Sequence, residues 1–337
     1  MRAFTYHRPA SLEDAVASLA RPHTHALGGG TDLLPCVEDG VATPSSVVDL
    51  RAIRGLDLIE TLPEGGLRMA AAARIADIAA SDLVRSRFPV LAAACDAVGT
   101  PALRNMGTLG GSLCQRPRCW YFRRGIACLK NGGATCPAHD GENQYHAILD
   151  GGPCYIVHPS DPAVALTALD ADVEITGPDG TSRIPITQFF VLPRDRMDSE
   201  TVLRQGEMVS AVIIPAAFSE TLKPSNGQTI KPSNRQAVKQ IFRKLTQRSA
   251  WDFALVSIAA TRRSDGAVRL VLGGVAPRPW RVSESVEEDV ASGGLDDDSI
   301  AALVDRALYD AEPLSKNGYK VALAASLLRE AITELSA

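Results

Sequence analysis

The stretch from Gly107 to Asp161 places the strongest constraint on how this 337-residue chain folds. It opens with the glycine-rich run Gly107-Thr108-Leu109-Gly110-Gly111-Ser112 and closes with His158-Pro159-Ser160-Asp161. Five of the seven cysteines lie between these ends: Cys114, Cys119, Cys128, Cys136 and Cys154. Disulfide frameworks belong to small secreted chains, so cysteines gathered in one part of a large chain favour a metal site.

The spacing from Cys119 to Cys154 is C-x8-C-x7-C-x17-C. It contains neither the C-x2-C pair of zinc fingers nor the tight cysteine run of small ferredoxins. From the spacing alone, a four-iron cluster, a zinc ion and free thiols are comparable alternatives. His139, His146 and His158 are further candidate ligands, although lone histidines are more often hydrogen-bonded structural residues. We expect Cys36 and Cys95, which stand apart, to be buried thiols or incidental residues.

Another glycine run, Gly28-Gly29-Gly30-Thr31-Asp32-Leu33, follows a short predicted strand. It comes earlier in the chain and is called the first glycine run below, and Gly107–Ser112 is called the second. Consecutive glycines let backbone N–H groups approach a phosphate closely. A dinucleotide fingerprint of the Rossmann type would need a third glycine at Leu33, so that interpretation is weak. The alternative is a flexible turn without a ligand. Two glycine runs in one domain favour a ligand that is held from two sides.

Hydrophobic periodicity and turn residues divide the chain into two domains and a linker. We expect a first domain over 1–215, made of subdomains 1–57 and 58–215 with the cysteine insert at 114–154. The polar linker 216–236 contains a repeated Lys-Pro-Ser-Asn, and a second domain follows over 237–337. Expected helices lie at 12–19, 75–84, 89–98, 162–169, 296–309 and 315–335. Expected strands lie at 25–27, 47–50, 67–71, 173–175, 207–215, 253–261 and 268–273.

Composition excludes several classes of function. The net charge of −4 gives no support to a partner with a phosphate backbone, and 5% aromatic residues argue against a base-stacking surface. We therefore expect no nucleic-acid partner. No apolar run is long enough to span a bilayer, so we expect no membrane partner. The N-terminal residues lack an apolar signal core, which makes the cytoplasm the default location.

Both glycine runs and Asp161 resemble the flavin-binding signatures of the medium subunit of molybdenum hydroxylases, the family of xanthine and carbon monoxide dehydrogenases. The resemblance extends to Lys244 and to the segment Leu272-Gly273-Gly274-Val275-Ala276-Pro277-Arg278-Pro279-Trp280-Arg281, so it covers nearly the whole chain. It is strongest for the flavin subunit of periplasmic aldehyde oxidoreductases, which carries an additional [4Fe-4S] cluster in a similar loop. The matching residues begin with Gln115-Arg116-Pro117-Arg118-Cys119-Trp120-Tyr121-Phe122. The flavin subunit of 4-hydroxybenzoyl-CoA reductases also carries such a cluster.

The resemblance implies an α+β fold: an FAD-binding domain of the vanillyl-alcohol-oxidase (PCMH) type in two α/β subdomains, followed by a small α+β domain of antiparallel sheet and helices. It also implies which residues hold the cofactors. The first glycine run would line the pyrophosphate of FAD. The residues implied to bind FAD are Leu27, Gly28, Gly29, Gly30, Thr31, Asp32, Leu33, Gly99, Thr108, Gly110, Gly111, Ser112, Asp161, Val209 and Lys244, and those implied to hold a [4Fe-4S] cluster are Cys119, Cys128, Cys136 and Cys154.

The implied function is electron transfer within a heterotrimer. A large molybdopterin subunit would oxidise the substrate, which the resemblance implies to be an aldehyde. A small [2Fe-2S] subunit would pass the electrons to FAD and on to an external acceptor. We find no catalytic residue for substrate oxidation in this chain. The resemblance also implies periplasmic export together with a signal-bearing small subunit. The alternatives are a subunit of a xanthine dehydrogenase-like or 4-hydroxybenzoyl-CoA reductase-like enzyme, a stand-alone flavin oxidoreductase of the same fold, and a zinc-stapled binding module without flavin.

Overall fold

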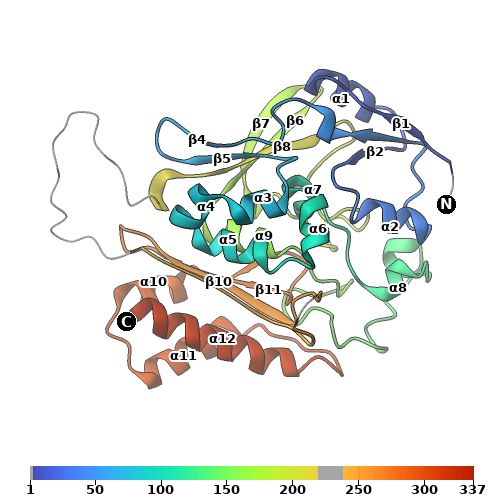
Figure 1. Cartoon of the computed structure of the whole chain (residues 1–337). Helices are drawn as coiled ribbons and strands as arrows, with labels where there is room; N and C mark the ends of the chain where they lie inside the picture. The colour runs from blue at the N-terminus through green and yellow to red at the C-terminus, as the bar shows by residue number, and fades with distance from the viewer. Residues whose placement is uncertain (1–2, 219–237, 250) are drawn as a thin grey trace.

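The computed structural model of the chain describes residues 3–218, 238–249 and 251–337. Three sheets and their helices are arranged in layers, with a group of helices lying between two of the sheets (Figure 1). The predicted α+β class is therefore confirmed. The repeated Lys-Pro-Ser-Asn of the linker lies outside the described residues. In the described part of the chain, no helix is both long and apolar enough to cross a membrane.

The first subdomain is a small parallel sheet with two helices. Its strands pair in the order β1-β3-β2, and all neighbours are parallel. The Ser11 hydroxyl accepts a hydrogen bond from the Asp14 amide at 3.1 Å, which fixes the start of the first helix where the sequence predicts it. The elements are β1 (Thr5–His7), α1 (Leu12–Leu19), β2 (Thr24–Leu27), α2 (Leu33–Glu38) and β3 (Ser46–Asp49).

The second subdomain combines a five-stranded antiparallel sheet with the helical layer. The strand order is β4-β5-β8-β6-β7, so the fully buried β8 lies at the centre. The strands are β4 (Ile59–Thr61), β5 (Leu67–Ala70), β6 (Asp172–Gly177), β7 (Gly180–Pro185) and β8 (Met208–Ile214). The helices are α3 (Ile75–Ala80), α4 (Asp82–Arg87), α5 (Pro89–Asp96), α6 (Pro101–Met106), α7 (Leu109–Leu113), α8 (Trp120–Arg123) and α9 (Asp161–Ala168).

Two expectations for this subdomain are corrected. The helix expected over 75–84 is two helices, because Ser81 is extended and caps α4 by accepting a hydrogen bond from the Val84 amide. A short polar side chain competes with helical hydrogen bonds, which periodicity alone does not register. The second glycine run is also more than a turn, since Thr108 caps the short helix α7 that contains Gly110 and Gly111.

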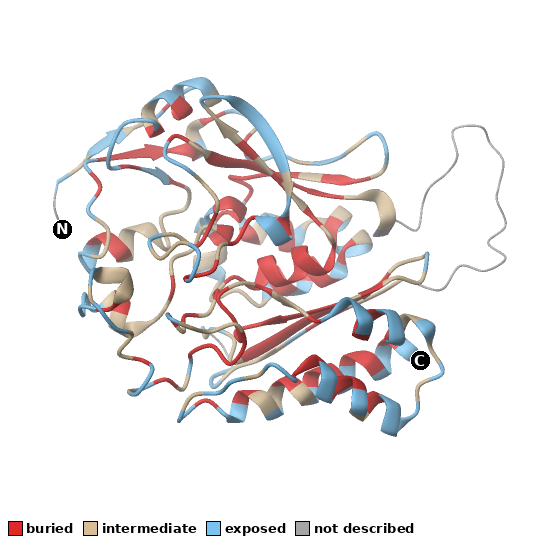
Figure 2. Cartoon of the chain, turned by 180° about the vertical axis from the view of Figure 1, so that it is seen from behind, coloured by how far each residue is buried: buried red, intermediate tan, exposed pale blue. Residues whose placement is uncertain are grey.

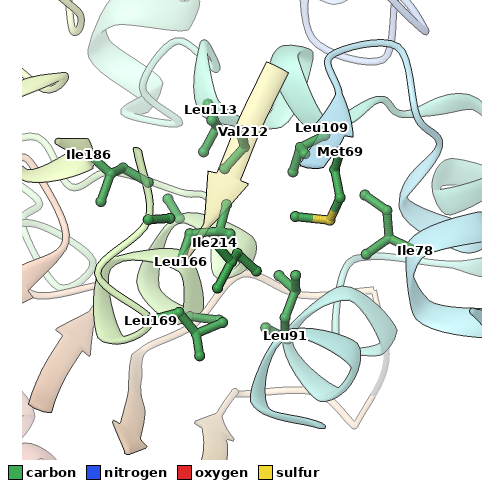
Figure 3. Close-up of a cluster of buried hydrophobic side chains, with 14 of the residues drawn as sticks. Met69, Ile78, Leu91, Leu109, Leu113, Leu166, Leu169, Ile186, Val212 and Ile214 are labelled. Carbon is green, nitrogen blue, oxygen red and sulfur yellow. The ribbon is translucent and has the colours of Figure 1, made fainter. Parts of the chain in front are cut away.

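The main core lies between the five-stranded sheet and the helical layer. Figure 3 shows Met69, Leu91, Leu109 and Leu166 converging on the central strand from different elements. Each of these side chains has no exposed surface, and burial of a side chain of this size contributes about 1.5–3 kcal/mol. Helix α9 is buried along its whole length because it also packs against the sheet of the second domain. It therefore holds both domains together.

The second domain is a four-stranded antiparallel sheet with three helices on its outer face (Figures 1 and 2). The predicted hairpin is present as β10 and β11, which pair from Ser257–Gly273 to Arg262–Val268. Strand β9 and helix α10 were not predicted. The elements are β9 (Lys239–Leu245), β10 (Val256–Arg262), β11 (Val268–Gly273), β12 (Trp280–Arg281), α10 (Glu284–Ser292), α11 (Asp297–Ala307) and α12 (Tyr319–Ser336).

Candidate cofactor sites

The two glycine runs contact each other at one wall of a large cavity. Gly29 lies so close to the second run that a Cβ atom built on it would be 1.6 Å from the Met106 carbonyl oxygen. A Cβ on Gly28 would lie 2.4 Å from the Thr108 hydroxyl oxygen. Side chains at these positions would force the two runs apart. The close contact between the runs therefore requires glycine at both positions.

The amides of the two runs have different tasks. In the second run, the Gly110 amide donates to the Ala71 carbonyl at 2.8 Å, and the Gly111 amide donates to the Thr108 hydroxyl at 3.2 Å. In the first run, the amides of residues 29–32 donate no hydrogen bond to any residue that the structure describes. Backbone donors for a phosphate are therefore available in the first run, whereas the second run uses its own to hold its shape.

Asp161 and Lys244 form a buried ion pair at the boundary of the two domains. Lys244 on β9 donates to the Asp161 carboxylate at 2.7 Å and to the Ala97 carbonyl at 2.9 Å. Their side chains are 7% and 8% exposed. Burial raises the pKa of Asp161, and the neighbouring ammonium opposes that shift. The pair neutralises itself, so its first effect is to fix the domains on either side of the cavity.

The cavity has a volume of about 940 Å³ and reaches from the first subdomain to the second domain. It brings together every residue implied to bind FAD except Leu27, whose side chain is buried outside the lining. Those that line it are Gly28, Gly29, Gly30, Thr31, Asp32, Leu33, Gly99, Thr108, Gly110, Gly111, Ser112, Asp161, Val209 and Lys244. The lining thus joins residues that are far apart in the sequence.

Two further segments of the lining escaped the sequence analysis. Residues 203–208 precede Val209; the signal in the sequence was Gly206, whose φ in the structure is +88°. Trp251 and Phe253, which are 62% and 45% exposed, belong to the cavity rim from the second domain. The Arg118 guanidinium lies over the Phe253 ring, 4.9 Å from its centroid. The signal here was a pair of aromatic residues in a polar loop.

These residues fit FAD. The volume falls within the roughly 300–1,000 Å³ of cavities that enclose large ligands. Two sets of glycines leave room for a backbone approach, the first run offers unused amides, and Arg116 and Arg118 add positive charge to the wall. A dinucleotide with a diphosphate needs this combination of apolar wall and anion-binding donors.

Four cysteines from the insert converge on a second, much smaller cavity. Cys119, Cys128, Cys136 and Cys154 all line it, together with Lys130 and His146. Cys114 does not; it lines the large cavity, where burial raises its pKa to about 12. All seven cysteines are free, and Cys36 and Cys95 are buried as expected.

The surroundings of the four thiols differ. A hydrogen bond from Cys154 lowers the pKa of Cys136 to about 6, whereas burial raises that of Cys119 to about 11. The His146 Nε2 atom lies 3.2 Å from the Cys119 sulfur.

The other two candidate histidines do not line this cavity. His139 pairs with Asp140 at the surface, and His158 packs edge-on against Phe190. Burial lowers the pKa of His158 to about 4, which keeps its imidazole neutral.

The donor set of the small cavity suits an iron–sulfur cluster, which takes four thiolates. Among the residues that the structure describes, no group of three or more His, Cys, Asp or Glu side chains is placed to hold a single metal ion. The cavity measures about 10 Å³, so a cluster of four irons would require the thiols to move apart.

Salt bridges tie the insert to the first glycine run. The Asp32 carboxylate accepts from the Arg116 amide at 2.8 Å and from the Arg123 guanidinium at 2.6 Å, and it pairs with Arg118 at 2.9 Å. Asp32 was predicted as a residue that binds FAD. In the structure its carboxylate is occupied by the insert, so its position depends on how the insert folds.

Comparison with known proteins identifies both domains. Residues 2–217 match the family described as FAD binding domain in molybdopterin dehydrogenase, and residues 241–335 match the CO dehydrogenase flavoprotein C-terminal domain. The chain is 36% identical to the aldehyde oxidoreductase FAD-binding subunit PaoB of Escherichia coli K12, over 100% of this chain and 99% of that protein. It is 26% identical to the glyceraldehyde dehydrogenase medium chain of Sulfolobus acidocaldarius, over 93% of this chain and 89% of the relative.

Solved structures share the fold. The chain aligns with a chain of carbon monoxide dehydrogenase from Hydrogenophaga pseudoflava at a TM-score of 0.72 and 23% identity, over 100% of this chain and 99% of that one. The corresponding values for quinoline 2-oxidoreductase from Pseudomonas putida 86 are 0.71 and 23%, over 99% and 97%. With the family match over more than half of its length and the full-length similarity to an oxidoreductase subunit, the chain belongs to the FAD-binding medium subunits of the molybdenum hydroxylase family.

Proposed function

We propose that this chain is the electron-transfer subunit of a heterotrimeric molybdenum hydroxylase that oxidises aldehydes. Its FAD would receive electrons from the [2Fe-2S] clusters of a small subunit and pass them to an external acceptor, while a large molybdopterin subunit oxidises the substrate. The observation that carries the proposal is the cavity lined by both glycine runs in a chain that is similar over its full length to an FAD-binding subunit. Asp161 and Lys244 in this cavity bind each other.

An aldehyde substrate is supported by the 36% identity over the full chain to an aldehyde oxidoreductase subunit. The lower identity to xanthine dehydrogenase subunits, 24% for the FAD-binding subunit of Escherichia coli O157:H7, makes a purine substrate the weaker candidate. Assembly with partner subunits is supported by the same relatives, which are named as an FAD-binding subunit and a medium chain.

We propose in addition that the insert holds a [4Fe-4S] cluster on Cys119, Cys128, Cys136 and Cys154. Support comes from the convergence of these four thiols on one cavity, although they are spread over 36 positions of the sequence. Lys130, whose side chain is fully buried beside them, supplies a positive charge that stabilises thiolates.

FAD supplies the redox chemistry when it is bound, and the protein sets its position and electrostatics. The first glycine run offers amides to the diphosphate, and Arg116 and Arg118 add positive charge beside it. Asp161 and Lys244 line the cavity from the two domains. The aromatic side chains of Trp251 and Phe253 form its rim.

Reduction of the isolated chain tests whether it transfers electrons without oxidising the substrate itself. The purified protein should show flavin bands with a broad brown shoulder from the cluster. Dithionite should bleach the flavin, whereas an aldehyde should do so only after addition of the two partner subunits. Bleaching by aldehydes without the partner subunits would contradict the proposed function. A flavin spectrum without the brown shoulder would contradict only the proposed cluster.

We also propose that the subunit reaches the periplasm by export together with a signal-bearing small subunit. The proposal is supported by the resemblance to periplasmic aldehyde oxidoreductases. Cell fractionation with and without the small subunit tests it, and periplasmic protein in the absence of any partner would contradict it.

A further inference from the structure

A line of three charged side chains, of which Lys130 and Glu200 are buried and Arg116 is partly exposed, joins the cysteine cavity to the FAD cavity. It starts at Lys130, which lines the cysteine cavity and whose side chain has no exposed surface. The Lys130 ammonium donates to one carboxylate oxygen of Glu200 at 2.7 Å and to the Met197 carbonyl at 2.7 Å. A buried ammonium needs such a partner, because an unpaired charge in the interior is costly.

Glu200 lies in the middle of this line. Only 5% of its side chain is exposed, and its second carboxylate oxygen forms an ion pair with the Nε atom of Arg116 at 2.7 Å; the Arg116 side chain is 35% exposed. Arg116 lines the FAD cavity, and so do Asp198 and Ser199 of the segment that carries Glu200. One carboxylate therefore holds a cation at each of the two cavities.

The backbone of Arg116 continues the connection to the first glycine run, because its amide donates to the Asp32 carboxylate. The Arg116 guanidinium also lies over the Phe122 ring, 5.0 Å from its centroid, which limits its freedom. Away from bulk water, a unit charge acts over a longer distance than it does at the surface. A change of charge at the cysteine cavity should therefore change the electrostatic potential in the FAD cavity.

We propose that Glu200 is a positioning residue that couples the two cavities electrostatically, by fixing Arg116 at FAD and Lys130 at the cysteines. The significance of this coupling for electron transfer rests on the proposed cluster, but the effect on FAD does not. The three side chains carry a net charge of one positive unit. Reduction makes the flavin more negative, so added positive charge nearby raises its midpoint potential and lost positive charge lowers it.

The test measures the midpoint potential of FAD bound to the full-length chain. Glu200→Gln adds one positive unit to the group and should raise the potential. Lys130→Met removes one unit and should lower it. The double variant restores the net charge and should return the potential close to that of the parent. A merely structural role would give shifts that do not follow the sign of the charge.

Glu142→Gln is the matched control. Glu142 lies in the same insert and pairs with Lys316 of the second domain, but its side chain is 57% exposed, so water and salt screen its charge. It should leave the potential unchanged. If Glu200→Gln fails to retain FAD, Lys130→Arg replaces it and should keep the parent potential while Lys130→Met lowers it. Equal potentials, or shifts of the same sign for Glu200→Gln and Lys130→Met, overturn the proposal. Iron and sulfide analysis of the parent tests the cluster separately.

Discussion

At the scale of single residues, the five cysteines of the insert divide by position. Four line the small cavity, and Cys114 lines the FAD cavity instead. Serine at Cys119, Cys128, Cys136 or Cys154 should therefore remove most of the iron and sulfide. Cys114→Ser should keep both near the parent level.

Iron and sulfide analysis of the five single variants measures this difference. Cys95→Ser, at a buried thiol in α5, is the control for loss of a cysteine outside the insert. If Cys114→Ser loses the cluster while Cys119→Ser retains it, the assignment is wrong and Cys114, at the FAD cavity, belongs to the ligand set.

Lys320 is a buried cation that holds the insert against the second domain. Its ammonium donates to the carbonyls of Tyr145, His146 and Gly274 at 2.8–3.1 Å. Burial lowers the pKa of Lys320 from 10.5 to about 7, so between these values the folded protein binds fewer protons than the unfolded chain. The free energy of unfolding should consequently rise with pH over this interval.

Chemical denaturation of the parent and of Lys320→Met at several pH values between 7 and 10 measures that contribution. The variant should show a smaller rise with pH, whatever its absolute stability. Lys239→Met, which removes an ammonium bonded to the Glu334 carbonyl in a more exposed place, should keep the slope of the parent. Equal slopes for the parent and Lys320→Met would show that Lys320 titrates normally.

At the scale of elements, the site depends on two glycine runs that the chain separates by about 80 positions. A methyl group on Gly29 would overlap the Met106 carbonyl, so Gly29→Ala must move the runs apart. We expect the dissociation constant of FAD to rise on the order of tenfold or more, which corresponds to about 1.4 kcal/mol. Fluorescence titration with FAD measures it.

Gly318→Ala is the matched control, because a Cβ at Gly318 meets nothing within 4 Å and the backbone there needs no positive φ. Unchanged FAD affinity in Gly29→Ala would mean that the contact between the runs is not required for binding.

Several elements follow from local pattern, and others do not. Helix α1 is specified by Ser11 and its apolar spacing, and the hairpin of β10 and β11 by alternation around a Ser-Asp-Gly turn. Strand β9 carries Lys239, Arg243 and Lys244 among few apolar residues, so its pattern is concealed by functional and surface charges. The cysteine cavity could not be derived from spacing, because its geometry is set by the tertiary contacts of Asp32, Glu200 and Lys320 with the insert.

At the scale of the whole molecule, α9 and β9 join the two domains through the Asp161–Lys244 pair. Removal of one partner leaves a buried, uncompensated charge, which costs roughly 3–5 kcal/mol. Asp161→Asn and Lys244→Met should each destabilise the protein by about that amount. The double variant should lose clearly less than the sum of the two single variants, since no charge remains unpaired.

A double-mutant cycle on the free energy of unfolding, with FAD affinity recorded in parallel, measures the coupling. Arg306 and Asp289 provide the control pair, because they lie within the second domain and are 48% and 52% exposed. Exposed pairs couple by roughly 0.2–1 kcal/mol, so the control cycle should be nearly additive. If the pair holds the domains around FAD, each single variant at Asp161 or Lys244 should also weaken FAD binding. If the two single variants are additive in the free energy of unfolding, or if FAD affinity does not change in them, the ion pair does not hold the domains around FAD. Domain docking would then depend on the apolar faces of α9 alone.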